Sequence, residues 1–391
     1  MYIPYGKQNI SEEDIQSVVD VLKSDWLTQG PVVPKFESAI ADLVDCKYAV
    51  ASNSATSSLH LACKALGIGR GDIVWTSPLS FVASSNCALY CDAIVDFVDI
   101  NLKTYNIDVV KLEEKLKLAE ASGNLPKCVI PVHLAGRSCE MRAIYDLSKK
   151  YGFKIIEDAS HAVGASYKKT PVGSCRYSDI TVFSFHPVKI ITSGEGGMAL
   201  TNDQNLAMKM ATLRSHGVIR DESLMTDIAH GPWYYEQLDL GFNYRMTDIS
   251  AALGLSQLSN LAKFVEQRNF LADRYDELLA DSPFILPSRD NDSLSSFHLY
   301  IVRVEGSKPR SSHKIIFNKL RSSGIGVNLH YIPIYKHPYY RKFDFNDDLY
   351  PAAELYYESA ISIPLFPGLT SEEQEFIVKT LHTPPGYQNI F

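Results

Sequence analysis

The sequence predicts an α/β protein, with an open, mostly parallel sheet and helices on both of its faces. In the first half of the 391-residue chain, short runs of β-branched and aromatic residues recur, and each run is continuously apolar. Strands buried on both faces of a parallel sheet have this composition. Helix-like stretches separate the runs, and this alternation is typical of an α/β sheet. The predicted strands are YAVAS (48–52), DIVWTS (72–77), AIVDFV (93–98), KCVIPVH (127–133), FKIIED (153–158), DITVFSF (179–185) and MALTN (198–202).

Two helices between these strands are well marked. TSSLHLACKAL (56–66) follows the first strand, and MRAIYDLSKKYG (141–152) ends in two lysines and Gly152. Basic residues in the last turn followed by glycine are a normal helix stop.

The character of the chain changes after about residue 245. Residues 249–280 carry apolar positions at the three- and four-residue spacing of a long helix. A strand at 296–304, a helix at 313–324 and a strand at 326–332 follow. We therefore expect a large domain over residues 1–250 and a smaller C-terminal α+β domain over 251–391, linked by the helix at about 249–280.

Composition excludes several classes of function. Lys plus Arg number 38 and Asp plus Glu 45, so the net charge is 38 − 45 = −7, with no basic run to bind nucleic acid. No apolar stretch approaches the roughly 20 residues that span a bilayer, and the N-terminus lacks the pattern of a signal peptide. The seven cysteines are scattered without a C-x-x-C pair, which favours free thiols over zinc. We expect a cytoplasmic protein that binds neither membrane nor nucleic acid.

Polar and charged residues stand at the ends of three of the predicted strands, at the edge where open α/β sheets bind their ligands. The first strand runs into the small polar residues 53–58, at the start of a helix. Free N–H groups, hydroxyls and the positive end of the helix dipole there suit a phosphate group. Ordinary N-capping by serine or threonine is the alternative.

The other two strand ends carry an acidic pair and a lysine. Glu157 and Asp158 end a buried strand, where a carboxylate must meet a cation, a metal or a hydrogen-bond donor; Asp158 could also cap a helix. Lys189 follows the strand at 179–185 and precedes the glycine-rich turn 194–197. Such a lysine is either a surface residue or a nucleophile whose pKa is lowered.

Taken together, the three strand ends match one cofactor. Pyridoxal 5′-phosphate requires a site for its phosphate, a carboxylate for its ring nitrogen and a lysine for its aldehyde. We expect the three groups to lie at the ends of adjacent strands, and Asp158 and Lys189 are 189 − 158 = 31 residues apart, about one strand–connection–strand unit. A metal site is a weaker interpretation because His161 and His186 lack ligand spacing. The glycines at 67–71 precede their strand and so fail the dinucleotide fingerprint.

Several ordered segments resemble the DegT/DnrJ/EryC1/StrS family of fold-type I, pyridoxal-phosphate-dependent sugar-nucleotide aminotransferases. The resemblance runs from about residue 4 to about residue 380. It implies a mixed seven-stranded sheet in the large domain and a homodimer with active sites at its interface. The segments are TQGPVVPKFE (28–37), NSATSSLHLA (53–62), SFVASSN (80–86), EDASHAVGA (157–165), FSFHPVK with GEGG (183–197), RSHG (214–217), GFNYRMTDISAALGLSQL (241–258) and HYIPIY (330–335).

The resemblance also implies roles for single residues. Lys189 matches the lysine that binds the aldehyde and moves the proton, and Asp158 matches the carboxylate that pairs with the ring nitrogen. His161 stands where the family more often has glutamine, near the 3′-oxygen, and Phe81 matches the aromatic that stacks on the ring. The phosphate ligands would be Ala55, Thr56, Ser184 and, from the partner subunit, Asn243.

The implied reaction moves the amino group of L-glutamate to C4 of a nucleotide-linked 4-keto-6-deoxy sugar. The segments HPVK, GEGG, SHG and HYIPIY resemble the pseudaminic acid branch of the family, whose acceptor is UDP-4-keto-6-deoxy-N-acetyl-β-L-altrosamine. Candidates for substrate contacts are His330, Tyr331, Tyr335 and Arg245, although a structural aromatic cluster would also explain the first three.

Three alternatives remain open at this stage. Another UDP-, dTDP- or GDP-linked 4-ketosugar is one possible acceptor. A pyridoxal-phosphate-dependent sugar dehydratase is a second alternative, but family members of that kind replace the lysine with histidine, and this chain retains Lys189. A non-catalytic regulator of the same fold is a third, although it would have no need for a reactive amine.

Overall fold

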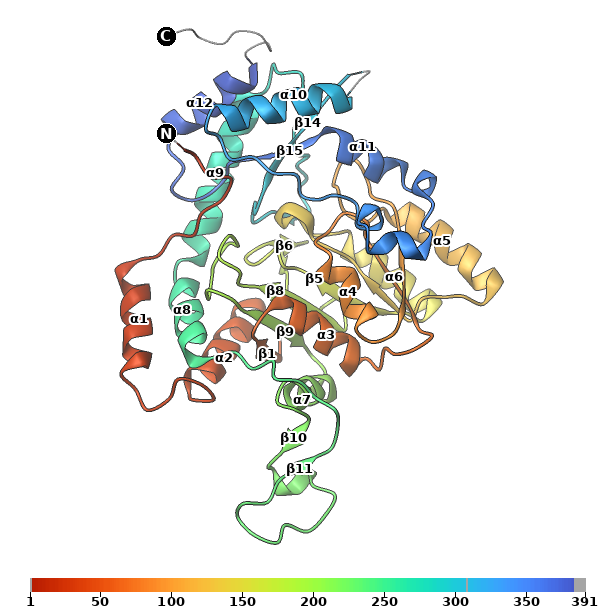
Figure 1. The fold of residues 1–391 in the computed structure, drawn as a ribbon, viewed down its shortest axis with the longest axis vertical. Coiled ribbons are helices and arrows are strands. Elements are labelled where there is room, and N and C mark those ends of the chain that lie inside the picture. The colour runs from red at the N-terminus through yellow and green to blue at the C-terminus, as the bar shows by residue number, and fades with distance from the viewer. Residues whose placement is uncertain (1, 307–308, 383–391) are drawn as a thin grey trace.

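The computed structural model describes residues 2–306 and 309–382 and is built around a mixed seven-stranded sheet (Figure 1). β9 runs antiparallel to both of its neighbours, and the other pairings are parallel. This confirms the predicted fold class. In spatial order the strands are β1 (Tyr48–Ser52), β9 (Gly197–Thr201), β8 (Ile180–Ser184), β5 (Lys154–Asp158), β4 (Cys128–Ile130), β2 (Ile73–Thr76) and β3 (Ile94–Phe97).

The strands are apolar throughout because both faces of the sheet are covered. Val50 and Val182 pack into one core with α3 (Ala55–Ala65), α4 (Ala83–Leu89) and α7 (Gln204–Leu213). The neighbouring residues in the two strands, Ala51 and Phe183, pack on the opposite face. That face is covered by α2 (Val32–Val44), α5 (Val109–Ser122), α6 (Met141–Tyr151) and the helices that follow residue 248.

The single long helix predicted at 249–280 is wrong, because the chain forms two helices there. They are α8 (Asp248–Leu258) and α9 (Leu261–Leu278). At the break the Ser259 hydroxyl donates to the Ser256 carbonyl, and the Asn260 N–H donates to the Gln257 carbonyl in a three-residue turn. Serine and asparagine compete for backbone groups in this way, and apolar periodicity alone does not register it.

A second, three-stranded sheet forms the core of the C-terminal region. Its strands are β12 (Phe284–Ile285), β14 (Tyr300–Val304) and β15 (Ala360–Ile363), and α9, α10 (Pro309–Ser322) and α12 (Ser371–His382) surround it. The N-terminal segment joins this region, since Ile3 lies in the same core. A division at residue 250 therefore leaves the first residues of the chain packed with the second region, and the domain boundary stays a prediction.

Two predicted strands of this region differ from the structure. The strand expected at 296–304 begins only at Tyr300, because Phe297 has a left-handed backbone with φ 45°. The segment 326–332 is not a strand, apart from an isolated pairing of Asn328 with Ser362. The Gly326 N–H instead donates to the Ile3 carbonyl, a long-range partner that local sequence patterns do not reveal.

The remaining elements lie around the two sheets. They are α1 (Glu12–Leu22), β6 (Ser166–Tyr167), β7 (Thr170–Pro171), β10 (Val218–Ile219), β11 (Glu236–Gln237), β13 (Ser293–Leu294) and α11 (Pro351–Ser359). All seven cysteines are free and buried. Within residues 2–306 and 309–382, none of the helices has both the length and the apolar character needed to cross a membrane.

Candidate active site

A cavity of about 710 Å³ opens at the carboxyl ends of β1, β5 and β8. Nine of the predicted site residues line it: Ala55, Thr56, Phe81, Asp158, His161, Ser184, Lys189, His330 and Tyr331. The expectation that all three strands are adjacent is only partly right. β5 and β8 are neighbours, but β9 lies between β8 and β1. Because β9 is antiparallel to both, the carboxyl ends of β1 and β8 still meet at one edge.

The first turn of α3 forms one end of the cavity. Ser54 caps the helix, and its hydroxyl accepts from the Ser57 N–H at 3.2 Å. Ala55 and Thr56 line the cavity where the first N–H groups of a helix have no partner within the helix. Gly197 of β9 allows this close approach, since a Cβ there would lie 2.4 Å from the Ser54 carbonyl carbon.

Lys189 lies in the loop after β8 and points its amine into the same cavity. Burial lowers the pKa of this amine to about 8, although the nearby Asp158 carboxylate opposes the shift. About one amine in ten is therefore neutral at pH 7, against fewer than about one in a thousand for an ordinary lysine. The Nζ atom lies 3.5 Å from Nε2 of His298.

Asp158, at the end of β5, is 4% exposed and hydrogen-bonded on both carboxylate oxygens. One oxygen accepts from the Ser160 N–H at 3.1 Å and the Ser160 hydroxyl at 2.6 Å, and the other accepts from the Ser84 hydroxyl at 2.5 Å. A buried carboxylate was expected to need a cation, a metal or a hydrogen-bond donor, and serines supply the donors here. These hydrogen bonds hold the carboxylate in a fixed position at the cavity.

Glu157, the other member of the acidic pair, points to the opposite side of the strand. Its carboxylate accepts from His133 Nε2 at 2.7 Å, from Ser178 at 2.5 Å and from Thr181 at 3.2 Å. Burial opposes ionisation of Glu157, but these hydrogen bonds outweigh it and lower its pKa. Burial likewise opposes a charge on His133, yet contacts with Cys139 and Glu157 raise its pKa to about 10.

We expect Glu157→Gln to lower the free energy of unfolding by about 2 kcal/mol near pH 6, because it removes half of a buried ion pair. The lowered pKa of Glu157 contributes stability above its ordinary pKa that is lost as pH falls. The raised pKa of His133 contributes stability below its ordinary pKa that is lost as pH rises through about 10. Urea unfolding of both proteins should show the difference shrinking as pH falls and Glu157 becomes protonated. A difference that stays constant at low pH would contradict the ion-pair explanation.

Three histidines, His161, His298 and His330, line the cavity together with the amine. His161 Nδ1 accepts from the Ala135 N–H at 3.3 Å, so its Nε2 carries the proton and donates to the Tyr331 hydroxyl at 3.1 Å. His330 Nε2 faces the Asn328 amide at 3.4 Å, and its Nδ1 lies 2.8 Å from the Ser362 hydroxyl. Burial and Lys189 lower the pKa of His330 to about 3.

Sequence reasoning missed His298 and Ser84. Ser84 lies within the segment 80–86 of the family resemblance but was given no role, and His298 precedes an apolar strand outside all of the quoted segments. Phe81, by contrast, was found only through the family resemblance. Its side chain is 59% exposed at the wall of the cavity, which is unusual for a large apolar residue.

Three predicted site residues lie elsewhere in this chain. Tyr335 is a correction: it is buried, its hydroxyl donates to Glu354 at 2.6 Å, and its ring stacks on Tyr350 at 4.8 Å between centroids. It therefore belongs to a structural aromatic cluster. Asn243 is exposed and Arg245 partly buried, and neither lines the cavity of its own subunit. Whether they reach a partner's site stays a prediction.

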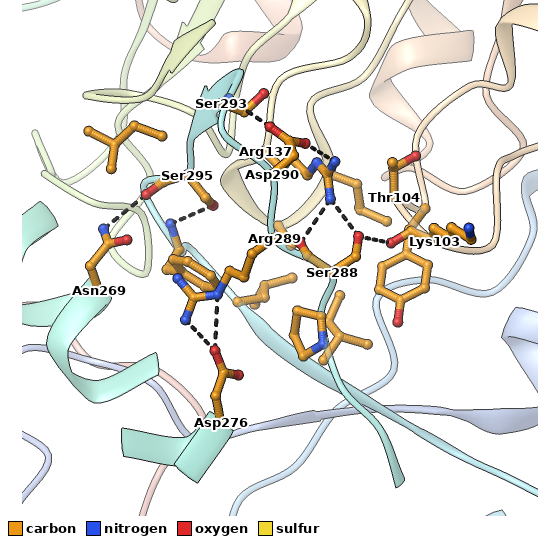
Figure 2. Close-up of a pocket in the computed structure, with 18 of the residues that line it drawn as sticks. Lys103, Thr104, Arg137, Asn269, Asp276, Ser288, Arg289, Asp290, Ser293 and Ser295 are labelled. Carbon is orange, nitrogen blue, oxygen red and sulfur yellow. Dashed lines mark hydrogen bonds and ion pairs between the residues drawn. The ribbon is translucent and has the colours of Figure 1, made fainter. Parts of the chain in front are cut away.

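Figure 2 shows a second cavity, which has a volume of about 340 Å³. Its arginines are already paired, Arg137 with Ser288 and Asp290, and Arg289 with Asp273 and Asp276. Ser295, Phe297 and Leu299 line it, whereas the intervening His298 lines the first cavity. The segment 295–299 thus contributes to both cavities. Because both arginines of the second cavity are paired with carboxylates, this cavity is not a candidate for the cofactor.

The first cavity fits pyridoxal 5′-phosphate by the chemistry of its groups. It combines a helix N-terminus, a rigid buried carboxylate and an amine of lowered pKa on a sheet of mixed direction. The fold and the site together define a pyridoxal-phosphate-dependent aminotransferase. The chain belongs to the DegT/DnrJ/EryC1/StrS aminotransferase family, whose model matches residues 8–382. It is a sugar aminotransferase that uses pyridoxal phosphate.

Two relatives and two solved structures illustrate the similarity. The spore coat polysaccharide biosynthesis protein SpsC of Bacillus subtilis is 38% identical over 97% of this chain and 96% of its own. The UDP-4-amino-4,6-dideoxy-N-acetyl-beta-L-altrosamine transaminase of Campylobacter jejuni is 37% identical over 97% and 96%. The structure of Helicobacter pylori PseC, an aminotransferase involved in the biosynthesis of pseudoaminic acid, covers 97% of this chain and 98% of its own, with 32% identity and a TM-score of 0.89. The putative sugar aminotransferase Spr1654 of Streptococcus pneumoniae, solved in PLP and PMP forms, covers 97% and 98%, with a TM-score of 0.87 and 30% to 31% identity.

Proposed function

We propose that this chain transfers the amino group of L-glutamate to C4 of UDP-4-keto-6-deoxy-N-acetyl-β-L-altrosamine, in the biosynthesis of pseudaminic acid. The observation that carries the transfer is that the Lys189 amine and the Asp158 carboxylate open into one cavity with the first turn of α3. The sugar and the nucleotide rest on the names of the Campylobacter and Helicobacter proteins.

In this proposal Lys189 is the catalytic residue that carries protons. Pyridoxal phosphate, when bound, supplies an electron sink for the electron pair left when a Cα–H bond of the donor breaks. Lys189 takes that proton and returns it, and a pKa of about 8 makes both of its forms available near neutral pH. Asp158 favours a proton on the ring nitrogen, because a rigid carboxylate stabilises a positive charge beside it.

The remaining cofactor contacts follow from the position of each side chain. Ala55, Thr56 and Ser184 would hold the phosphate through helix N–H groups and hydroxyls. Phe81 would cover one face of the ring. His161 and the Tyr331 hydroxyl to which it donates would lie beside the 3′-oxygen.

The sugar would approach from the side of His330 and Tyr331. Both nitrogens of His330 already have partners in Asn328 and Ser362, so we assign it to holding this wall in place. The Tyr331 hydroxyl, which accepts from His161, keeps its own proton to donate. Arg245 would meet an anionic group of the nucleotide only if a partner subunit supplied it.

An acceptor screen tests the substrate. Purified protein, pyridoxal phosphate and L-glutamate are combined with UDP-, dTDP- or GDP-linked 4-keto-6-deoxy sugars, and the products are identified by mass spectrometry. We expect the UDP-linked altrosamine derivative to be aminated fastest, with one 2-oxoglutarate formed for each amine. A preference for dTDP- or GDP-sugars would redirect the assignment to another acceptor. Loss of the C3 hydroxyl without transfer of nitrogen would identify a dehydratase.

We also propose that the active form is a homodimer with shared sites. The segment that contains β10 and β11 extends away from the body of the molecule (Figure 1). It exposes large apolar side chains, with Ile228 93%, Leu240 77% and Trp233 68% accessible. Apolar surface of this extent is typical of a protein interface. Asn243 follows this arm directly in the sequence.

Subunit mixing should restore activity if Asn243 serves the partner's site. Lys189→Ala lacks the amine, and Asn243→Ala lacks one phosphate ligand. In a mixed twofold dimer one site carries both defects and the other carries none, because each contact occurs twice with the chains exchanged. We expect unfolding and remixing of the two weak variants to raise activity above the average of the separate samples. Activity that stays at that average, with subunit exchange confirmed by mass, would place Asn243 outside the partner's site.

A further inference from the structure

We propose that His298 is a positioning residue that donates a hydrogen bond from Nε2 to the Lys189 amine, and that it thereby stabilises the neutral form of this amine and orients it toward the cavity. The contact of 3.5 Å joins Nζ of Lys189, the atom that must carry the proton, to the one ring nitrogen of His298 that has a partner among the described residues. This inference rests on the proposed role of Lys189 and adds a residue that controls its charge.

The direction of the hydrogen bond follows from the other nitrogen of the ring. Nδ1 of His298 is buried and has no hydrogen-bond partner among the described residues. A neutral imidazole carries its proton on one nitrogen only. A buried N–H without an acceptor is rarer in proteins than a buried acceptor without a donor. The proton therefore lies on Nε2, and Nε2–H can donate only to a neutral amine, since an ammonium has no lone pair.

The ring cannot easily turn away from Lys189, because its backbone is held on both sides. Arg268 of α9 is 1% exposed, and one of its nitrogens donates to the carbonyls of Phe297, His298 and Leu365 at 3.0 to 3.3 Å. The Phe297 ring lies under the Arg289 guanidinium, 4.3 Å from ring centroid to guanidinium carbon, and both residues line the second cavity. His298 also packs on His161 with 4.3 Å between ring centroids.

The charges around His298 act in the same direction. Burial, Lys189, His161, Arg268 and His330 lower the pKa of His298 far below its ordinary value, so the ring stays uncharged. Arg268 also lines a small cavity of about 10 Å³ together with Lys189.

The other titratable groups at the cavity are few. Asp158 is the carboxylate that opposes the neutral amine. Glu195 and His186 lie 3.8 Å from each other and also line the cavity, as do Tyr5 and Tyr331. His161 and His330 are held neutral by burial and by Lys189.

The test measures the pKa of the Lys189 amine in cofactor-free protein. Acetic anhydride is added over a range of pH, and mass spectrometry quantifies acetylation of the peptide that contains Lys189. We expect His298→Phe, which keeps an aromatic ring but no donor, to raise this pKa by about one unit and to slow labelling at pH 7 about tenfold. His298→Gln, which keeps an N–H near the position of Nε2, should restore most of the wild-type value.

His382→Phe, an exposed substitution in the last turn of α12, is the control for the general effect of replacing a histidine. An unchanged pKa in His298→Phe would overturn the proposal. A lowered pKa would overturn it as well, because it would mean that His298 accepts from an ammonium. This measurement does not involve a sugar acceptor. The His298 proposal can therefore fail while the acceptor screen succeeds, and the acceptor screen can fail while the His298 proposal holds.

A second measurement uses the wild-type chain and needs no variant to fold. In cofactor-free protein with ¹⁵N-labelled histidines, studied at about pH 9 where most of the Lys189 amine is neutral, the two neutral tautomers of histidine give different nitrogen shifts. The His298 signals, assigned by their loss in His298→Gln, should report a proton on Nε2. A proton on Nδ1 would contradict the proposal whatever the labelling shows.

Discussion

Replacement of Lys189 by alanine is expected to lower transamination at least about 10³-fold, the largest effect of any single substitution that we consider. The change removes both the group that binds the aldehyde and the group that moves the proton. The half-reaction with L-glutamate, followed by absorbance and by release of 2-oxoglutarate, measures the loss. Borohydride treatment of the wild-type holoenzyme should fix the cofactor onto the peptide that contains Lys189.

Lys189→Arg separates the chemistry of the amine from its charge. Arginine keeps a cation in the loop but does not become neutral in proteins, so it should be nearly as inactive as alanine. Lys209→Ala, an exposed change on α7, should leave activity unchanged. Fixation of the cofactor on a lysine other than Lys189 would contradict the assignment.

Asp158→Asn is expected to keep the fold and to lower activity by roughly 10²- to 10³-fold, equivalent to about 3 to 4 kcal/mol. The amide oxygen can keep the hydrogen bonds from Ser160, and the amide NH2 group can donate to the Ser84 hydroxyl, which can turn its own proton to Ser80, so local packing should survive. A neutral amide cannot stabilise a positive charge on the ring nitrogen. The measurement is again the half-reaction rate with L-glutamate, at saturating cofactor.

Glu157→Gln provides a matched control for this substitution. The two carboxylates are adjacent on β5 but point to opposite faces, one toward the cavity and the other toward His133. Asp158→Asn should therefore change the rate with little change in unfolding, and Glu157→Gln should change unfolding with little change in rate. Near-wild-type rates in Asp158→Asn would refute its role.

Much of the fold could be predicted because buried strands leave a local signature. Val50 and Ala51 face different cores, so a strand covered on both sides has no polar positions, and this is visible without a structure. The positions of Asp158 and Lys189 at strand ends were predictable for the same reason. Two features were not predictable from the sequence. The hydrogen bond of the Ser259 hydroxyl is a side-chain contact, and the hydrogen bond from Gly326 to Ile3 joins segments that lie far apart in the chain.

Within the site, sequence patterns located the groups with charge and missed the neutral groups that control them. Ser84 and His298 reach Asp158 and Lys189 from positions 74 and 109 residues away in the chain. Tyr335 was assigned to the substrate because it follows Tyr331 closely, but its side chain turns into a cluster with Glu354 and Tyr350. Proximity in sequence does not determine the direction of a side chain in an irregular segment.

The sequence by itself determined the fold class, the cofactor and the order of the residues that bind it, since these depend on apolar periodicity and on residue type at strand ends. Only the tertiary structure decided the partners of each functional group: serines for Asp158, an ion pair for Glu157, and a histidine with one unpaired nitrogen for Lys189. The reason is physical. Burial and hydrogen bonding decide whether an amine or a carboxylate is charged, and both arise from segments brought together by folding.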